Sequence, residues 1–444
     1  MAGLMRITRV LRGSGTMGRD HVVILGTGWG GMRMVQSLDP KKYQISVVSP
    51  RNHMLFTPML ASAAVGTVSC DAVCEPVRPW VAKNGGRYYE ASAEQVDTEK
   101  RTVKCHTGAD EDFTLSYDRL IVAVGYQANT FGIPGADKYA MFMKETADGM
   151  KLREQILRRL EEASTYHIMD GDMNLTEAEK DHMRKILTFV IVGGGPTGVE
   201  LCGELTDFLS QDVARQYPHL KDLVSVHMIT DVVLGMFDKA MSDYAIDNLS
   251  KKQNVKLHLD AMVSEVTKTD LTLKSGMKID YGTLVWCAGV GAGPFVRNVN
   301  LPKTPNGKAI LTDGYMRVQG FEDIYALGDC ASVNGGRLPP TAQVAKQQAI
   351  YLANNMNSGQ PVSQWKEFQF QSLGMMAYVG GNKAIMDSPI GAKFYGMLGW
   401  LSWRSAYWTM QLSVRNRFLL STDWSRTILF GRDLTRHGNP SRPQ

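Results

Sequence analysis

The chain lacks any uninterrupted apolar run of the ~18–20 residues that a membrane-spanning helix needs. Hydrophobic residues nevertheless make up 44% of its 444 positions, an ordinary share for a globular protein. The sequence therefore predicts no transmembrane helix. The length suits two or three domains at the usual ~100–200 residues each.

Cysteine is also scarce, with six residues in the chain. Cys70 and Cys74 are four positions apart, and no second pair or histidine cluster completes a zinc site. They do not form a C-x4-C pair, which would indicate a redox-active dithiol. Cys202 and Cys287 lie inside apolar segments, which favours buried thiols. We expect no metal site, no disulfide framework and no catalytic thiol.

Acidic residues are missing from the N-terminus and rare at the C-terminus. Residues 1–19 contain four arginines and no acid, and residues 391–444 contain eight basic residues against two acidic ones. The two ends together exceed the net charge of +5, so the central part is net acidic. This distribution argues against a nucleic-acid-binding core. Residues 1–19 resemble a mitochondrial targeting peptide, and a disordered basic tail is the alternative.

The first glycine-rich motif lies in His21–Gly31 (HVVILGTGWGG), where an apolar strand runs into a predicted helix over 32–38. Gly26, Gly28 and Gly31 have G-x-G-x-x-G spacing. In such a motif the first glycine permits a tight turn, the second lets a pyrophosphate approach, and the third lets the helix lie close to the sheet. The pattern predicts a dinucleotide site, and an ordinary glycine-rich turn is the alternative.

The same pattern returns after the apolar segment Thr188–Val192, with glycines at 193, 195 and 198 and a predicted helix over 199–209. The next predicted strand, Val224–Ile229, is followed by Asp231, which is suited to bind an adenosine ribose. No arginine stands beside Asp231 to hold a 2′-phosphate, which favours NADH over NADPH.

Two such motifs predict two bound dinucleotides, for which FAD with a nicotinamide cofactor is the economical pair. The predicted fold class is α/β, with two Rossmann-like dinucleotide-binding domains. The strands expected over 118–125 and 283–289 end in Gly125 and Gly289, two further candidate cofactor contacts. The strand over 44–49 ends in Ser49, where an acid would bind the ribose of the first dinucleotide.

The sequence between the two motifs contains other predicted elements. Residues 87–107 alternate as in a hairpin, and 144–163 has apolar residues near helical spacing. A loop is expected over 170–174. Thr176–Glu179 is a capping box that opens a short helix ending near Leu187.

Residues 324–329 (IYALGD) predict a strand ending in Gly-Asp, which is similar to the second FAD motif of two-dinucleotide-domain flavoproteins. Three further blocks are SPRNHMLFTPML at 49–60, GGGPTGVE at 193–200 and LPPTAQVAKQQAIYLAN at 338–354. Together with the tail from Gly374, they closely resemble the type II (alternative, rotenone-insensitive) NADH:ubiquinone oxidoreductases of mitochondria. The resemblance covers roughly residues 21–436.

The resemblance implies a role for each matching residue. Asp329 would bind the ribityl chain of FAD. The AQ-x-x-x-Q signature would place Gln343 and Gln347 near a quinone ring, with Lys346 where some relatives have histidine. Glu200 would act near the nicotinamide. A solvent-facing helical turn is the alternative for the two glutamines. The implied FAD contacts are Gly26, Gly28, Gly31, Ser49, Arg51, Thr57, Gly125 and Asp329, and the implied NADH contacts are Gly193, Gly195, Gly198, Asp231 and Gly289.

The resemblance also implies a domain order. A targeting peptide would occupy residues 1–19. An FAD domain (20–150 and 291–375, the second part with the quinone segment) would be split by an NADH domain (151–290). Residues 376–444 would attach the protein to a membrane and form a homodimer. Trp400, Trp403 and Trp408 stand close together there, and tryptophan with arginine favours the headgroup level. The alternative for this region is a helix packed on the core.

The implied activity is hydride transfer from NADH to FAD and then two-electron transfer to ubiquinone, without proton pumping. The expected location is the mitochondrial inner membrane, peripherally. A sulfide:quinone reductase is less favoured because no cysteine follows Cys330. An apoptosis-inducing-factor-like flavoprotein is less favoured because the central part is acidic.

Overall fold

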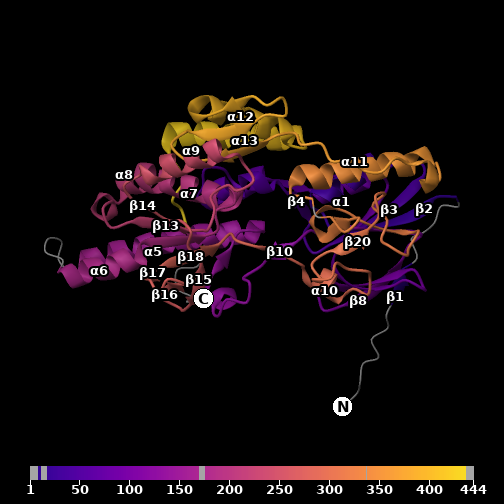
Figure 1. Cartoon of the computed structure of the whole chain (residues 1–444), viewed down its shortest axis with the longest axis horizontal. Helices are drawn as coiled ribbons and strands as arrows, with labels where there is room; N and C mark the ends of the chain where they lie inside the picture. The colour runs from indigo at the N-terminus through magenta and orange to yellow at the C-terminus, as the bar shows by residue number, and fades with distance from the viewer. Residues whose placement is uncertain (1–8, 12–17, 170–175, 337, 437–444) are drawn as a thin grey trace, which may run out of the picture. The chain divides into compact units, whose positions relative to one another are not determined.

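The computed structural model describes residues 9–11, 18–169, 176–336 and 338–436 (Figure 1). The predicted loop over 170–174 and most of the predicted targeting peptide lie outside the described residues. Contacts divide the chain into two compact units that alternate along the sequence. Unit 1 comprises Met1–Met54, Pro76–Gln127 and Val290–Ser372, and unit 2 comprises Leu55–Glu75, Ala128–Gly289 and Leu373–Gln444.

Unit 1 is built on an eight-stranded sheet whose order is β1-β8-β7-β6-β3-β2-β9-β21. The strands from β6 to β21 are parallel, whereas β7 pairs antiparallel with both β6 and β8. The strand bounds are β1 Arg9–Leu11, β2 Asp20–Leu25, β3 Tyr43–Ser49, β6 Arg87–Asp97, β7 Thr102–Thr107, β8 Asp112–Ser116, β9 Arg119–Val122 and β21 Ile324–Ala326.

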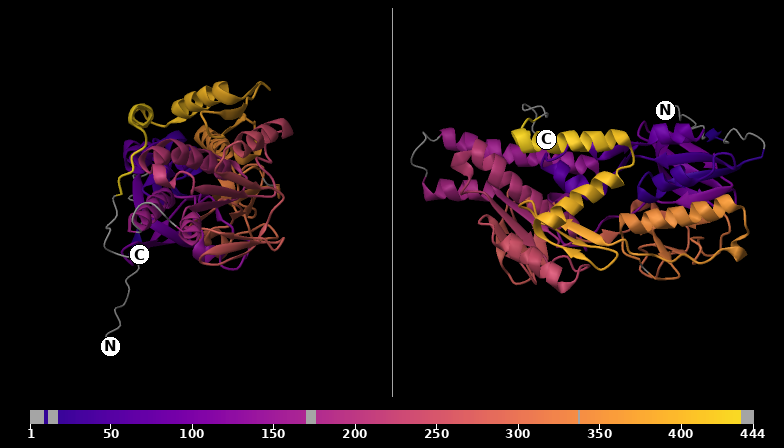
Figure 2. Two further views of the ribbon diagram at one scale, coloured as in Figure 1. Left: turned by 90° about the vertical axis from the view of Figure 1, so that its left-hand side faces the viewer. Right: turned by 90° about the horizontal axis from the view of Figure 1, so that it is seen from above.

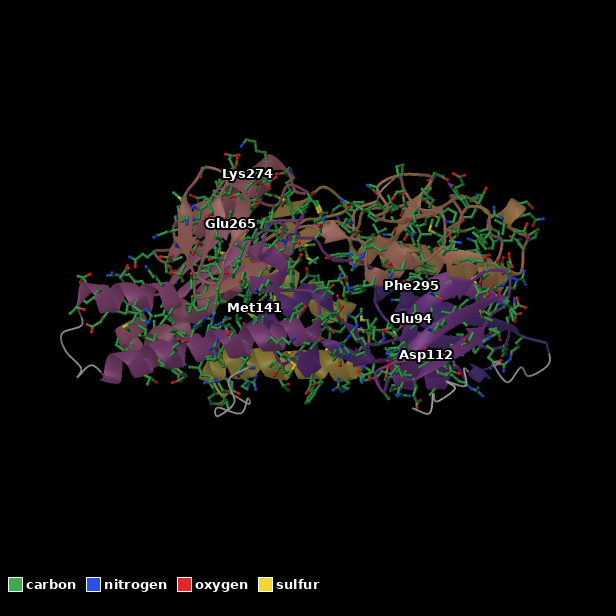
Figure 3. All side chains as sticks on the ribbon, turned by 90° about the horizontal axis from the view of Figure 1, so that it is seen from below. Glu94, Asp112, Met141, Glu265, Lys274 and Phe295 are labelled. Atoms are coloured by element: carbon green, nitrogen blue, oxygen red, sulfur yellow. The ribbon has the colours of Figure 1, made fainter. Side chains whose placement is uncertain are left out.

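The central strands of this sheet are largely apolar because both of their faces are covered. All seven residues of β3 are buried. Helices α1 (Trp29–Ser37) and α11 (Ala342–Ser358) pack against each other and run side by side in Figure 1. At the antiparallel edge, Lys104 Nζ lies 3.1 Å from Glu94 and 3.2 Å from Asp112, two carboxylates labelled close together in Figure 3. Smaller elements of unit 1 are α3 Val77–Lys83, α10 Pro294–Asn298, β20 Ile310–Thr312 and β22 Ala331–Val333.

Unit 2 contains a five-stranded parallel sheet whose order is β11-β18-β12-β13-β14. Its strands are β11 Met141–Phe142, β12 Thr188–Val192, β13 Ser225–Ile229, β14 Val255–His258 and β18 Thr283–Trp286. Met141, labelled in Figure 3, pairs with Val285. A three-stranded antiparallel sheet, formed by β15 Val263–Val266, β16 Asp270–Leu273 and β17 Lys278–Asp280, shares an apolar core with it.

Helices surround these sheets. The predicted helix over 144–163 is α5, which extends to Thr146–Met169. The predicted capping box is confirmed, because the Thr176 hydroxyl accepts from Glu179 N while Glu179 accepts from Thr176 N. The remaining helices here are α2 Leu60–Ala64, α4 Ala136–Tyr139, α6 Glu177–Ile186, α7 Pro196–Phe208, α8 Ala214–Gln216 and α9 Lys239–Ser250.

The C-terminal segment of unit 2 begins with a small antiparallel sheet, β23 Met375–Tyr378, β24 Ala384–Asp387 and β25 Lys393–Phe394. Two helices follow, α12 (Gly396–Met410) and α13 (Val414–Phe430), which lie beside each other in Figure 2. The region around the predicted membrane-attaching tryptophans is therefore helical. No helix of the described residues is long and apolar enough to cross a membrane. The remaining short strands are β4 His53–Leu55, β5 Cys74–Pro76, β10 Gln127–Ala128 and β19 Val290–Gly291.

Candidate functional site

The first glycine turn joins β2 to α1 and shows why glycine is needed there. Gly26 has φ +105°, and a Cβ at this position would lie 2.4 Å from the carbonyl oxygen of Ala123. A Cβ on Gly31 would lie 2.0 Å from the oxygen of Gly26. A Cβ on Gly28, the middle position, would lie 3.8 Å from its nearest neighbour, the guanidinium of Arg51. A side chain would therefore clash at the two outer glycines. The middle glycine has space beside it, where a pyrophosphate would approach.

Ser49, the residue at the position of the absent acid, belongs to a buried hydroxyl network. Its Oγ lies 3.0 Å from the hydroxyl of Thr27, which also lies 2.9 Å from the carbonyl oxygen of Arg51. Ser49 Oγ further accepts from Arg51 N. These contacts shape the loop after β3 and hold the Arg51 backbone beside the glycine turn. The sequence analysis did not identify Thr27, whose position between two motif glycines was the available signal.

Asp329 follows β21 and lines a pocket together with Gly328, Pro340 and Gln348. Gln348 is buried, and its side-chain oxygen accepts a 2.6 Å hydrogen bond from Gly328 N. Gly328 has φ +72°, so this bond fixes a turn that glycine adopts readily. Gln348 therefore holds the Gly-Asp turn in place, a role that sequence reasoning missed because it considered only its neighbours on α11.

Helix α11 carries the three residues predicted for the quinone. Gln343 and Lys346 are half-buried in its first turns. Burial, and then the positive charge of Arg33, lower the pKa of Lys346 below its usual value. Gln347 pairs with the main chain of Gln371, donating from Nε2 to its oxygen (2.8 Å) and accepting from its N–H (3.1 Å). In this structure the Gln347 amide thus holds the segment at 371.

The second glycine turn, between β12 and α7, repeats the steric pattern of the first. Gly193 has φ +119°, and a Cβ there would lie 2.8 Å from Ala288 N. A Cβ on Gly198 would lie 1.9 Å from the oxygen of Gly193. A Cβ on Gly195, the middle position, would have no neighbouring atom within 4 Å. Gly289, just after β18, has φ +77°. The carboxyl ends of β12 and β18 therefore meet closely beside this turn.

The other predicted contacts are placed as follows. Asp231 stands exposed after β13, and its carboxylate accepts from Val232 N at 2.9 Å. Gly125, just beyond β9 in unit 1, has open space where a Cβ would point. Thr57 begins the 3-10 turn Thr57–Met59 and belongs to unit 2, the unit that also holds Asp231.

Glu200 lies on α7 inside an aromatic enclosure formed by the C-terminal segment. Its Oε1 accepts from Tyr378 N at 3.3 Å and from Trp403 Nε1 at 3.4 Å. The rings of Tyr378 and Trp403 are 5.5 Å apart, and those of Trp403 and Tyr407 are 4.9 Å apart. Burial raises the pKa of Glu200 to about 8. A carboxyl group in this setting can hold or release a proton near neutral pH.

Glu200 is the first of a row of acids along α7. Glu204 and Asp207 follow at helical spacing and are 4% and 3% exposed. Tyr378 OH donates to Asp207 at 2.5 Å, and Lys252 forms a 2.8 Å ion pair with it. The row was visible in the sequence as an i, i+4, i+7 pattern, but its partners lie far away along the chain.

A π-helical turn over Leu209–Val213 continues α7 and carries Asp212. The buried guanidinium of Arg432 reaches Asp212 at 2.9 Å, Glu204 at 3.4 Å and the hydroxyl of Thr67 at 2.9 Å. Glu204 also accepts from Thr67 and from Ser62, both at 2.6 Å. Arg432, from the end of the described chain, therefore pairs with two buried carboxylates, of which Asp212 also lies 3.4 Å from Arg215.

The fold is shared with known oxidoreductases. The family model described as pyridine nucleotide-disulphide oxidoreductase matches residues 20–349, and the NDH2 C-terminal domain matches residues 373–433. The structure of NDH2 from Plasmodium falciparum in complex with NADH aligns with a TM-score of 0.87 and 27% identity, covering 94% of this chain and 100% of that one.

Relatives of similar length share much of the sequence. An internal alternative NAD(P)H-ubiquinone oxidoreductase A1 (mitochondrial) of Arabidopsis thaliana is 38% identical, with 94% of this chain and 86% of the relative covered. An external NADH-ubiquinone oxidoreductase 2 (mitochondrial) of Saccharomyces cerevisiae is 35% identical, with 94% and 82% covered. The chain therefore belongs to the pyridine nucleotide-disulphide oxidoreductase family, and within it to the alternative, type II NADH:ubiquinone oxidoreductases.

Proposed function

We propose that the chain oxidises NADH and reduces ubiquinone by way of a non-covalently bound FAD, at the mitochondrial inner membrane. Unit 1 would bind FAD through Gly26–Gly31, Arg51 and Asp329, and unit 2 would bind NADH through Gly193–Gly198 and Asp231. The observation that carries this assignment is a steric pattern shared by two glycine turns in separate units. In both turns a side chain would clash at the outer glycines, and the middle glycine has space beside it.

The residues of the chain supply orientation and charge to this reaction. The N-termini of α1 and α7 offer N–H groups to the two pyrophosphates. Asp329 lines a pocket together with Gln348, and Glu200 offers a proton-holding group with a pKa of about 8. A bound flavin would supply the two-electron chemistry between NADH and quinone.

Purified protein that is denatured should release FAD, identified by mass. The intact protein should oxidise NADH with a short-chain ubiquinone as acceptor. Release of FMN, or turnover driven by sulfide and not by NADH, would contradict the proposal. The sulfide and apoptosis-inducing-factor-like alternatives are not favoured, because the relatives are named NADH-ubiquinone oxidoreductases.

A pair of glycine substitutions tests which turn binds which dinucleotide. Gly31→Ala should weaken flavin retention, whereas Gly198→Ala should retain flavin and raise KM for NADH. Each new methyl group would press on the backbone oxygen of the glycine five positions earlier. Overpacking of this kind corresponds to roughly five- to 100-fold in binding. The measurements are the flavin content and the steady-state KM.

Gly108→Ala is the matched control, because a Cβ there meets nothing within 4 Å. Flavin loss from Gly198→Ala with normal flavin in Gly31→Ala would reverse the assignment of the two turns.

Exposed apolar residues of the C-terminal helices support membrane attachment. The most exposed are Met397, Leu398 and Leu401 on α12 and Val414, Phe418, Ile428, Leu429 and Phe430 on α13. The same helices bury Trp403, Tyr407 and Trp424, so deleting them would also damage the core. Point substitutions on the exposed face are therefore the sharper test.

The double variant Leu401→Glu, Phe418→Glu should bind lipid vesicles at least about tenfold more weakly, because two side chains no longer enter the apolar layer. NADH oxidation with a soluble acceptor should be unchanged. Co-sedimentation with vesicles measures the binding, and Met277→Glu, at a position 52% exposed, is the control. Unchanged vesicle binding with loss of a dimer would instead identify this face as a subunit interface.

A further inference from the structure

Phe131 combines two features that rarely occur together. Its side chain is 62% exposed, and its backbone has φ +56°, a left-handed conformation that costs a bulky residue free energy. Among the described non-glycine residues with positive φ, Leu234 and Met316 are also large and apolar, but both are fully buried. Core packing offsets the free-energy cost of this backbone conformation at those two positions. Burial does not offset this cost at Phe131, which points to a function of the exposed ring.

The loop around Phe131 is held firmly by its neighbours. Phe131 N donates to Asn129 Oδ1 at 2.9 Å, and Trp286 Nε1 donates to the oxygen of Asn129 at 3.1 Å. The Thr130 hydroxyl donates to Asp137 at 2.9 Å. These contacts fix the backbone from which the exposed ring projects.

The ring stands beside Gly289, directly after β18. A Cβ on Gly289 would come 2.8 Å from Cζ of Phe131. Strand β18 lies on one side of β12 and β13 lies on the other, so the sheet order reverses between β12 and β18. In open parallel sheets, ligands bind outside the carboxyl ends of the strands at this reversal. Phe131 therefore borders the expected ligand crevice of unit 2.

The position of Phe131 in the sheet also indicates which half of the dinucleotide it would contact. A pyrophosphate on the N-terminus of α7 is centred on β12, and a ribose on Asp231 places the adenosine over β13. The other half of the dinucleotide then lies over β18, where Gly289 and Phe131 stand. An aromatic ring there can stack on a planar ring of the ligand.

We propose that Phe131 forms one wall of the nicotinamide subsite, contacting the nicotinamide ring of NADH and shielding it from water. This proposal rests on the NADH site proposed above for unit 2. The backbone strain serves to present the ring to the ligand.

ADP-ribose lacks the nicotinamide, so comparing it with NADH distinguishes contacts to the nicotinamide from contacts to the rest of the dinucleotide. In flavin-loaded protein, Phe131→Ala should raise KM for NADH by about five- to tenfold, the effect of losing one aromatic contact. Its inhibition constant for ADP-ribose, measured against NADH, should stay as in the original protein. KM for the quinone should also stay unchanged. Phe131→Tyr should retain normal KM for NADH, and Met277→Ala is the control for loss of an exposed apolar side chain.

Phe131→Gly distinguishes a purely structural role, because glycine adopts positive φ without strain. If Phe131 contacts the ligand, Phe131→Gly loses NADH affinity as Phe131→Ala does. Normal KM for NADH in both variants, or equal weakening of NADH and ADP-ribose, would overturn the proposal. If ADP-ribose fails to compete with NADH in the original protein, the NADH site of unit 2 is wrong and this subsite falls with it.

Discussion

Arg432→Met should lower the free energy of unfolding by about 3–5 kcal/mol, the usual cost of removing one member of a buried ion pair. Glu204 and Asp212 are 4% and 3% exposed, so neither can be solvated once the guanidinium is gone. At roughly 2–4 °C per kcal/mol, unit 2 should melt about 10 °C lower. Thermal unfolding followed by near-ultraviolet circular dichroism measures this change.

Two further variants identify the cause. Arg436→Met removes an arginine whose partner, Glu154, is more exposed, and it should cost less than about 1 kcal/mol. The triple variant Arg432→Met, Glu204→Gln, Asp212→Asn removes the buried charges together and should recover part of the loss. Equal losses for Arg432→Met and Arg436→Met would show that buried charge is not the reason.

Glu200→Gln should remove a pH dependence of stability. In the native protein the pKa of Glu200 is about 8, because burial disfavours the carboxylate, whereas in the unfolded chain it is near the ordinary value of 4.5. Below about pH 4.5 both states bind the proton. As pH rises toward 8, the unfolded chain loses the proton first, so native stability falls. Above about pH 8 the loss is complete.

The free energy of unfolding of Glu200→Gln relative to the original protein should therefore rise by ~3 kcal/mol between pH 5 and pH 7.5, at about 1.4 kcal/mol per pH unit. Denaturant unfolding of both proteins across this range measures the difference. Glu162→Gln, on the exposed side of α5, should track the original protein. A constant difference between Glu200→Gln and the original would show that the carboxyl is already ionised when buried.

Features that depend on neighbouring residues could be predicted from the sequence. Both glycine turns, the strands leading into them and the capping box at Thr176 were found because their cause lies within about ten residues. The mixed α/β fold with two dinucleotide-binding patterns is confirmed by the structure and by the relatives. The family was recognised for the same reason, through short contiguous blocks.

Features that depend on distant contacts could not be predicted. Arg432 and Glu204 are 228 positions apart, and nothing near either residue indicates the other. The sequence analysis placed residues 55–75 with the FAD domain, and contacts group them with unit 2. The roles of Gln343 and Lys346 remain predictions. For Gln347 the structure adds the main chain of Gln371, a partner 24 positions away that no motif contains.

The π-helical turn over Leu209–Val213 determines the spacing along the chain between the acids of α7 and Asp212. In a continuous α-helix, the side chain after Glu200, Glu204 and Asp207 on the same face would be Gln211. The wider turn takes up one additional residue, so Asp212 at 2.9 Å as well as Gln211 at 3.2 Å reaches the guanidinium of Arg432. A relative that is one residue shorter here would have to place its acid one position earlier. Aligning such a relative with this chain would require a gap inside a helix, where gaps are normally penalised.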